Sequence, residues 1–213
     1  MAVQIYYQTI QDIVLDEQLL SKLQPQRRKQ LLSFRFEADK KRCAAAGLLL
    51  WNYIYKGHPE NFTVSYNENG KPTVQDAPFF NLSHSGNFVM LAISDTPVGC
   101  DIEQLHKAIL TKHVFHPNEL AKLSSFPEGD ARNFEFLRLW TAKEAFLKAI
   151  GTGIDANANT YDLSNLNKIN SDKISQNSLN TIFLPDSSQW KIEHYTISDY
   201  PEYLSCICYK CLQ

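Results

Sequence analysis

Residues 98–103 read Val98-Gly99-Cys100-Asp101-Ile102-Glu103, a stretch that predicts both a strand and a candidate site. Apolar residues alternate here with glycine and two acids, the period-two pattern of a β-strand. Because alternate side chains of a strand share one face, the carboxylates of Asp101 and Glu103 are predicted to lie together. A single ion could then reach both of them.

Residues 140–148 read Trp140-Thr141-Ala142-Lys143-Glu144-Ala145-Phe146-Leu147-Lys148 and predict a helix. Glu144 and Lys148 are four positions apart, so they are neighbours on one helix surface. Three carboxylates and a lysine suit a hard, oxygen-preferring cation such as Mg²⁺ that also holds phosphate. Each part of this pattern also has a purely structural interpretation. Thr141 and Glu144 have the spacing of a capping box, and Glu144 and Lys148 could form an ordinary surface ion pair. Asp101 and Glu103 could simply face water from a half-buried strand.

Length and composition limit the classes of protein to which the chain can belong. Its 213 residues suit one large or two small domains, and a net charge of −2 argues against bulk nucleic-acid binding. No apolar run approaches the roughly 20 residues of a membrane span, and residues 1–7 lack the features of a signal peptide. Five cysteines, an odd number, fit a reduced compartment. We therefore expect a cytoplasmic protein that does not enter membranes.

Three cysteines, Cys206, Cys208 and Cys211, cluster near the end of the sequence. Residues 203–209 read as a strand with Cys206 and Cys208 on one face, and no second Cys/His cluster with zinc-like spacing accompanies them. We interpret them as small core residues rather than metal ligands.

The pattern along the chain predicts two α+β halves, 1–97 and 98–213, with the acidic strand at the start of the second. No linker between the halves is long enough for independent domains, so the site is expected at their shared interface. Residues 155–180, rich in Asn, Ser and Asp, are expected to be loops around short strands. The predicted helices cover 16–34 with an interruption at Pro25, 38–55, a segment starting near 117, and 133–150 with a bend near Trp140 and a cap at Gly151. The predicted strands cover 3–7, 62–66, 79–82, 88–94, 98–103, 183, 190–196 and 203–209, with a turn at 67–70 and a junction at 83–86.

Four motifs in this order resemble those of the 4′-phosphopantetheinyl transferase superfamily, in particular its long surfactin-synthetase-activating type. They are Gly70-Lys71-Pro72, Asn81-Leu82-Ser83-His84-Ser85-Gly86, the Gly99–Glu103 strand and the Trp140–Lys148 helix. The resemblance covers nearly the whole chain. It implies a pseudo-dimer of two similar α+β halves, each a small antiparallel sheet packed with helices, that works as a monomer.

The resemblance also implies an activity: transfer of the phosphopantetheine arm of coenzyme A to a serine of an acyl or peptidyl carrier protein, with release of 3′,5′-ADP. Mg²⁺, or Mn²⁺ in its place, would be held by Asp101, Glu103 and Glu144. Glu144 is the first choice for the base that takes the serine proton, and Glu119 is the second. Lys148 would stabilise the leaving phosphate. In family terms, the first half would contact coenzyme A and the second would hold the metal.

The nucleotide part of coenzyme A needs cationic and hydrogen-bonding partners. By resemblance these are Arg27, Arg42, Lys71, Ser83 and His84. Gln30 stands where relatives often carry lysine, so one phosphate contact is either missing or supplied by Arg28 or Lys29. Most other basic residues between positions 27 and 42 are expected to form a solvated helix face.

Two further hypotheses stay open. A Mg²⁺-dependent nuclease would use similar acidic groups, and a salt-sensitive shift of DNA or RNA in a gel would favour it. A carrier-binding or coenzyme A-binding protein of the same fold without catalysis would form a tight carrier complex with no turnover at saturating Mg²⁺.

Overall fold

The computed structural model describes residues 3–105, 112–154, 157–166, 180–184 and 188–212. The chain divides into two compact units, Met1–Asp95 and Thr96–Gln213. Each unit combines helices with small antiparallel sheets, which confirms the predicted α+β class.

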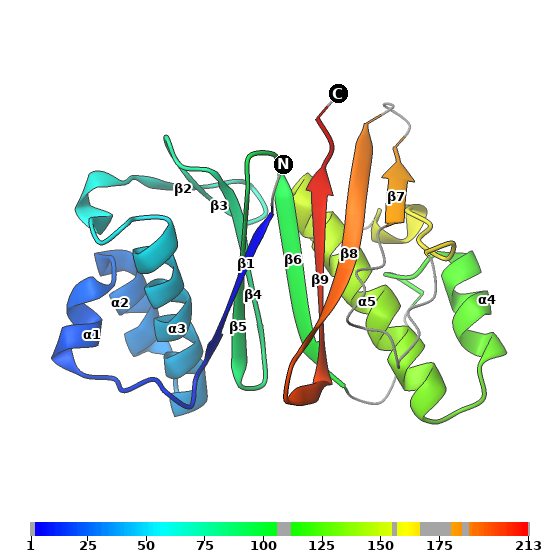
Figure 1. The fold of residues 1–213 in the computed structure, drawn as a ribbon, viewed down its shortest axis with the longest axis horizontal. Coiled ribbons are helices and arrows are strands. Elements are labelled where there is room, and N and C mark those ends of the chain that lie inside the picture. The colour runs from blue at the N-terminus through cyan, green and yellow to red at the C-terminus, as the bar shows by residue number, and fades with distance from the viewer. Residues whose placement is uncertain (1–2, 106–111, 155–156, 167–179, 185–187, 213) are drawn as a thin grey trace. The chain divides into compact units, whose positions relative to one another are not determined.

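The N-terminal unit contains an antiparallel sheet with the strand order β1-β5-β4 and a separate hairpin of β2 and β3. Helix α3 packs on β1 and β5, while α1 and α2 pack on α3 (Figure 1). The strands are β1 (Gln4–Thr9), β2 (Val64–Tyr66), β3 (Pro72–Val74), β4 (Phe79–Ser85) and β5 (Phe88–Ser94). The helices are α1 (Glu17–Lys22), α2 (Pro25–Ser33), α3 (Glu37–Tyr53) and the 3₁₀ turn η1 (Pro59–Asn61).

Small residues let the helices of this unit approach one another. Ala44, Ala45 and Ala46 of α3 are buried, and a Cβ added at Gly47 would lie 2.3 Å from the Leu23 side chain. The predicted interruption at Pro25 is confirmed, because Pro25 begins α2 at a position where its missing N–H costs nothing. The junction predicted at 83–86 is corrected: β4 runs to Ser85, since Ser83, His84 and Ser85 pair with β5.

The C-terminal unit contains an antiparallel sheet with the strand order β6-β9-β8-β7. Helix α5 packs on β6, β9 and β8, and α4 packs on α5 (Figure 1). The strands are β6 (Val98–Gln104), β7 (Asn180–Phe183), β8 (Gln189–Ile197) and β9 (Tyr200–Lys210). The helices are α4 (Pro117–Ser125), α5 (Asp130–Ile150) and the 3₁₀ turn η2 (Ala158–Thr160).

Helix α5 is longer than predicted and has no break. It runs from Asp130 to Ile150, and the bend expected near Trp140 is wrong because the helix contains no proline or glycine that would interrupt it. It ends at Gly151, whose left-handed φ of 84° confirms the predicted cap. Cys206 and Cys208 are fully buried in the core beneath α5, as predicted.

Much of the predicted loop region 155–180 lies outside the described residues; within it, residues 157–166 include the turn η2. Among the described helices, none has the length and apolar character needed to cross a lipid bilayer.

Candidate active site

The two acidic motifs meet in the C-terminal unit, where α5 lies on β6. The Nζ atom of Lys148 lies 2.6 Å from Asp101 Oδ1 and 3.9 Å from Glu144 Oε2. The Asp101 side chain is 4% exposed and the Glu144 side chain 15%, so this ion pair is largely shielded from water. The predicted neighbourhood of Glu144 and Lys148 is confirmed, and Asp101 joins them from the strand.

Gly99 makes this contact between strand and helix possible. A Cβ added at Gly99 would lie 2.1 Å from the carbonyl oxygen of Ala145 and 2.3 Å from the amide nitrogen of Ala149. These are backbone atoms of α5, which cannot move aside as a flexible side chain can. The absence of a side chain at Gly99 therefore brings β6 and α5 close enough for Lys148 to reach Asp101.

The charges of the cluster shift the pKa of Glu144. Burial raises this pKa to about 7; the Lys148 ammonium opposes the shift, and the carboxylates of Asp101 and Glu103 add to it. A carboxyl group with a pKa near neutrality can accept a proton and hold it at physiological pH. Glu144 thus has the proton affinity of a general base.

Lys148 is the cation of this cluster. Burial lowers its pKa, but the nearby carboxylates of Asp101 and Glu144 more than offset burial, and the net shift is upward. Lys148 therefore stays protonated at neutral pH.

The carboxylate oxygens of Asp101, Glu103 and Glu144 are ligands that Mg²⁺ prefers, although these side chains are not arranged as a metal centre. The carboxylates of Asp101 and Glu144 act on the Lys148 ammonium, and those of Asp101 and Glu103 add to the burial that raises the pKa of Glu144. Yet over the described ranges no group of three or more His, Cys, Asp and Glu side chains is arranged to hold a metal ion. The ligand set Asp101, Glu103 and Glu144 stays a prediction.

Glu119, the second candidate base, is held inside the unit by structural contacts. Its Oε2 accepts a hydrogen bond from the His116 amide at 2.8 Å, and its Oε1 accepts one from the Leu163 amide at 2.8 Å. Lys143 lies 2.9 Å from Oε1, and both side chains are fully buried. These contacts are typical of a carboxylate that holds α4 and a loop in place, so the geometry favours Glu144 as the base.

The capping-box interpretation of Thr141 and Glu144 is wrong. Thr141 lies in the middle of α5, where its hydroxyl donates to the carbonyl of Leu137 at 2.9 Å. The capping box is at the start of α4 instead, formed by His116 and Glu119. Glu144 is therefore available for chemistry rather than tied to a helix start.

A second group of predicted site residues gathers in the N-terminal unit. Arg27, Arg42 and His84 line one cavity of about 110 Å³. Arg42 donates to Asp39 Oδ1 at 2.6 Å and to the Gly86 carbonyl at 2.7 Å, which holds its guanidinium in place between α3 and the β4–β5 turn. A small cavity with three basic side chains can receive an anion such as phosphate.

Gln30 also lines this cavity. Lys71 lines a separate cavity of about 240 Å³ that includes residues of β3 and β4. Ser83 is 7% exposed on β4. The structure thus brings together three of the five residues predicted to contact coenzyme A.

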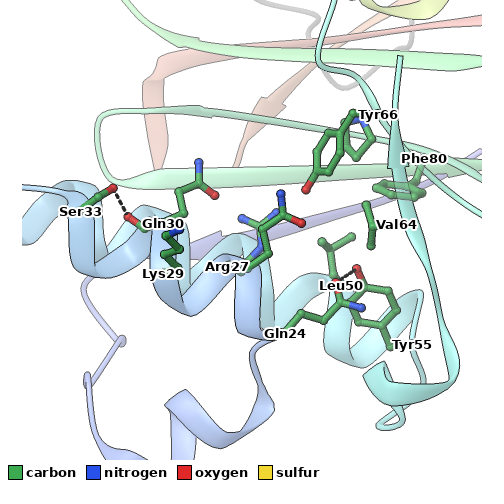
Figure 2. Close-up of a pocket in the computed structure, with 12 residues that line it drawn as sticks. Gln24, Arg27, Lys29, Gln30, Ser33, Leu50, Tyr55, Val64, Tyr66 and Phe80 are labelled. Carbon is green, nitrogen blue, oxygen red and sulfur yellow. Dashed lines mark hydrogen bonds between the residues drawn. The ribbon is translucent and has the colours of Figure 1, made fainter. Parts of the chain in front are cut away.

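A further cavity near these residues has a volume of about 440 Å³ (Figure 2). It shares Arg27 and Gln30 with the basic cavity, and it shares Pro72 and Phe80 with the Lys71 cavity, so both are its neighbours. Its aromatic lining comes from Tyr55, Tyr66 and Phe80. Sequence reasoning missed Tyr66, although its place just before the 67–70 turn and the Gly70-Lys71-Pro72 motif is a signal that could have identified it. An aromatic pocket beside an anion pocket suits a nucleotide.

Comparison with known protein families gives one match for each half of the chain. Residues 97–208 match the 4′-phosphopantetheinyl transferase superfamily. Residues 16–96 match the family described as 4′-phosphopantetheinyl transferase, N-terminal. Together the two matches span both acidic motifs and the three cavities.

Individual relatives extend over most of the chain. The 4′-phosphopantetheinyl transferase psf-1 of Bacillus pumilus is 32% identical over 90% of this chain and 81% of its own length. The 4′-phosphopantetheinyl transferase Sfp of Bacillus subtilis (strain 168) is 28% identical over 91% of this chain and 84% of its own length. A putative 4′-phosphopantetheinyl transferase of Synechocystis, slr0495, is 35% identical over 67% of this chain and 56% of its own length.

Proposed function

The chain belongs to the 4′-phosphopantetheinyl transferase superfamily and is an enzyme of that class, and we propose that it moves the phosphopantetheine arm of coenzyme A onto a serine of an acyl or peptidyl carrier protein. The products would be the holo-carrier and 3′,5′-ADP. The observation that carries this proposal is the cluster of Asp101, Glu144 and Lys148, which joins two separate motifs into one acid–base site.

The proposed reaction needs a base and a cation, and the cluster supplies both. The serine Oγ attacks the phosphorus that bears the pantetheine arm, and Glu144 takes the serine proton. The bond from that phosphorus to the oxygen of the departing 3′,5′-ADP breaks, and Lys148 stabilises the negative charge that grows on this oxygen. Without metal the pKa of Glu144 is about 7, so its carboxyl group can take up a proton near neutral pH, and a bound Mg²⁺ would lower this pKa.

Asp101, Glu103 and Glu144 would hold Mg²⁺ in this proposal. When bound, the ion would neutralise the charge of the pyrophosphate. The excess of carboxylates over ammonium in the cluster supports a dication there. Since carboxylates and phosphate oxygens suit Mn²⁺ as well, that ion should substitute.

We place the nucleotide part of coenzyme A in the N-terminal unit. The cavity lined by Arg27, Arg42 and His84 would take the 3′-phosphate, because guanidinium groups and an imidazole can donate hydrogen bonds to its oxygens. The adjoining cavity with Tyr66 would take the adenine, which an aromatic ring can stack against. Lys71 and Ser83 would contact coenzyme A from the neighbouring β3 and β4 segments. The pseudo-dimer, the shared site between the halves and the monomeric state stay predictions.

The test is the intact mass of an apo carrier protein after incubation with this enzyme, Mg²⁺ and coenzyme A. A gain of one phosphopantetheine that is lost on chelation and in Asp101→Ala supports the transfer and its metal dependence together. A gain that persists on chelation contradicts the metal dependence alone. No gain with either acyl or peptidyl carriers contradicts the transfer and favours the binding-only hypothesis.

A further inference from the structure

Gln30 and Cys43 contact each other in the wall of the basic cavity, which Arg27, Arg42 and His84 also line. Cys43 Sγ donates to Gln30 Oε1 at 3.9 Å and to the Arg27 carbonyl oxygen at 3.8 Å, so its proton is shared between two acceptors. Burial raises the pKa of the Cys43 thiol, which therefore keeps this proton at neutral pH. The thiol is thus able to hold the amide oxygen of Gln30 against the cavity wall.

The packing of α2 on α3 fixes this contact. Arg27 and Gln30 are three positions apart on α2, and Cys43 and Gly47 are four apart on α3, so each pair lies on one helix face. A Cβ added at Gly47 would lie 2.8 Å from Arg27 Cδ, which shows how closely the helices approach there. Arg27 therefore lies over Gly47, and Gln30 meets Cys43 about one turn further along (Figure 2).

The two cations between Arg27 and Gln30 have other surroundings. Arg28 donates from Nε to the Leu23 carbonyl at 2.9 Å and from Nη2 to the Ser21 carbonyl at 3.0 Å, which directs its guanidinium toward the chain before α2. Lys29 lines the neighbouring cavity of about 440 Å³ and not the basic cavity. The sequence leaves either residue open as a substitute phosphate contact, but in the structure it is Gln30 that lines the basic cavity.

The charge inside the cavity leaves room for a neutral donor to matter. Asp39 lines the same cavity and lies 2.6 Å from Arg42 Nη2, so its carboxylate offsets the charge of this guanidinium. Arg42 Nη1 donates to the Gly86 carbonyl at 2.7 Å. Hydrogen bonds that Arg42 gives to the protein are not given to a ligand, so a further donor in the wall strengthens the binding of an anion.

We propose that the amide nitrogen of Gln30 donates to the anion bound in the basic cavity, and that Cys43 positions this amide. The inference rests on the proposed function, in that the anion is the 3′-phosphate of coenzyme A. With Oε1 held by Cys43, the groups that the Gln30 side chain offers to a ligand are the two N–H donors of Nε2. A neutral donor thus stands where the family resemblance implies a lysine, and its contribution depends less on salt than that of a cation.

Calorimetric titration of the full chain with 3′,5′-ADP, and with 5′-AMP, which lacks the 3′-phosphate, tests the role of Gln30. Gln30→Ala should bind 3′,5′-ADP about fivefold more weakly than the wild type, the effect of one neutral hydrogen bond, with its 5′-AMP affinity unchanged. This factor should be the same at low and high ionic strength. Gln30→Lys should bind 3′,5′-ADP more tightly than the wild type and lose that gain at high ionic strength. Equal affinities of Gln30→Ala and the wild type for 3′,5′-ADP overturn the proposal.

A double-mutant cycle tests the positioning role of Cys43. Cys43→Ala should weaken 3′,5′-ADP binding about twofold in the wild-type background, since a thiol is a weak donor, and should have no further effect in Gln30→Ala. The same loss in both backgrounds would show that Cys43 acts without Gln30, and no loss in either would also overturn its positioning role. Cys211→Ala and Gln18→Ala, which alter residues outside the basic cavity, should bind both nucleotides as the wild type does.

These titrations separate the inference from the proposed function, because they need neither carrier nor transfer. A wild type that prefers 3′,5′-ADP, together with a Gln30→Ala variant that prefers it equally, contradicts the inference alone. A wild type that binds 3′,5′-ADP no more tightly than 5′-AMP contradicts the proposed place of the 3′-phosphate itself. Lys29→Gln should change the affinities for both nucleotides by the same factor. A loss of the 3′,5′-ADP preference in Lys29→Gln but not in Gln30→Ala would assign the contact to Lys29 and overturn the proposal.

Discussion

Glu144 shows how one side chain acquires a chemical role from its surroundings. As one of many acids in the sequence it has nothing that distinguishes its chemistry. In the structure it is largely buried beside two other carboxylates, and its pKa rises to about 7. The Lys148 ammonium opposes this rise in pKa. Because the Glu144–Lys148 pair is partly buried, its electrostatic effect is larger than that of an ordinary surface ion pair.

Replacing Glu144 separates its proposed catalytic role from its cost to the stability of the fold. We expect Glu144→Gln to lower transfer at least about 100-fold, because the base and one metal ligand are lost. The folded-state pKa of Glu144 lies above its ordinary value of 4.5, so its contribution to stability is full below pH 4.5 and is lost as the pH rises to about 7. Without metal, Glu144→Gln should therefore gain stability relative to the wild type between pH 5 and pH 8 in thermal melts.

The matched control for this variant is Glu37→Gln, which alters an exposed acid in a surface pair. It should transfer at the wild-type rate and show no such change of relative stability with pH. Near-normal turnover by Glu144→Gln would refute its role as the base.

His84 tests the basic cavity at the same scale. His84→Ala should raise the KM for coenzyme A about tenfold with kcat within twofold, since charge-assisted hydrogen bonds to a substrate are worth about 1.5–3 kcal/mol. The KM for dephospho-coenzyme A, which lacks the 3′-phosphate, should not respond to the variant. His58→Ala removes an exposed histidine that lines none of the three cavities described above and serves as the control. An equal rise for both substrates would place His84 away from that phosphate.

The contact between β6 and α5 sets the geometry of the site at the scale of elements. The strand supplies Asp101 and Glu103, the helix supplies Glu144 and Lys148, and neither element makes a site alone. Their backbones meet at Gly99, where even a methyl group would collide with the carbonyl of Ala145. The glycine of this motif is thus a requirement of packing rather than of chemistry.

Enlarging Gly99 should disrupt the site without changing any charged residue. We expect Gly99→Ala to lower the free energy of unfolding by about 1–3 kcal/mol, the usual cost of overpacking a core, and to reduce transfer strongly because α5 must shift. Chemical denaturation and the carrier mass assay measure the two effects. Gly70→Ala is the control, since a Cβ there meets nothing within 4 Å and only the positive φ of 78° is strained. If Gly99→Ala proved as stable and active as the wild type, the close contact between β6 and α5 would not be required for stability or transfer.

At the scale of the molecule, each unit has a hydrophobic core of its own. The core of the C-terminal unit is crossed by buried charged groups, including the pairs Glu119–Lys143 and Glu135–Arg138. His194 of β8 joins them, as its Nε2 lies 2.9 Å from the Arg138 carbonyl. A carbonyl only accepts hydrogen bonds, so this nitrogen carries a proton.

His194 should make the stability of the protein sensitive to acid. Burial, with the nearby Arg138 guanidinium, lowers its pKa to about 3 from the ordinary 6.5. A depressed folded-state pKa means that its contribution is present above pH 6.5 and is lost as the pH falls toward 3, by at most about 1.4 kcal/mol per pH unit. His194→Gln, which keeps a donor for the carbonyl, should flatten the pH dependence of unfolding below pH 6.5. The control is His58→Gln, which should keep the pH dependence of the wild type. If His194→Gln shows that same pH dependence, groups other than His194 cause the loss of stability in acid.

The sequence by itself determined the α+β class, the family and most of the element order, although it missed the short strand β3, because each depends on local patterns. Period-two alternation identified β6, the spacing of four identified the Glu144–Lys148 surface, and Pro25 and Gly151 marked helix ends. These features depend on backbone preferences that a few neighbouring residues decide. Even so, a capping motif at Thr141 and a bend at Trp140 were inferred locally and are wrong, since α5 continues through both.

Only the tertiary structure favours Glu144 over Glu119 as the proposed base, and only it shows which cation lies beside Glu144. The pKa of Glu144, the enclosure of Glu119 by Lys143 and two backbone amides, and the reach of Lys148 to Asp101 all depend on distances between residues remote in the chain. Electrostatic energy varies with separation and burial, which no local pattern encodes. Tyr66 was missed for the same reason, because a cavity exists only after strands and helices have packed around it.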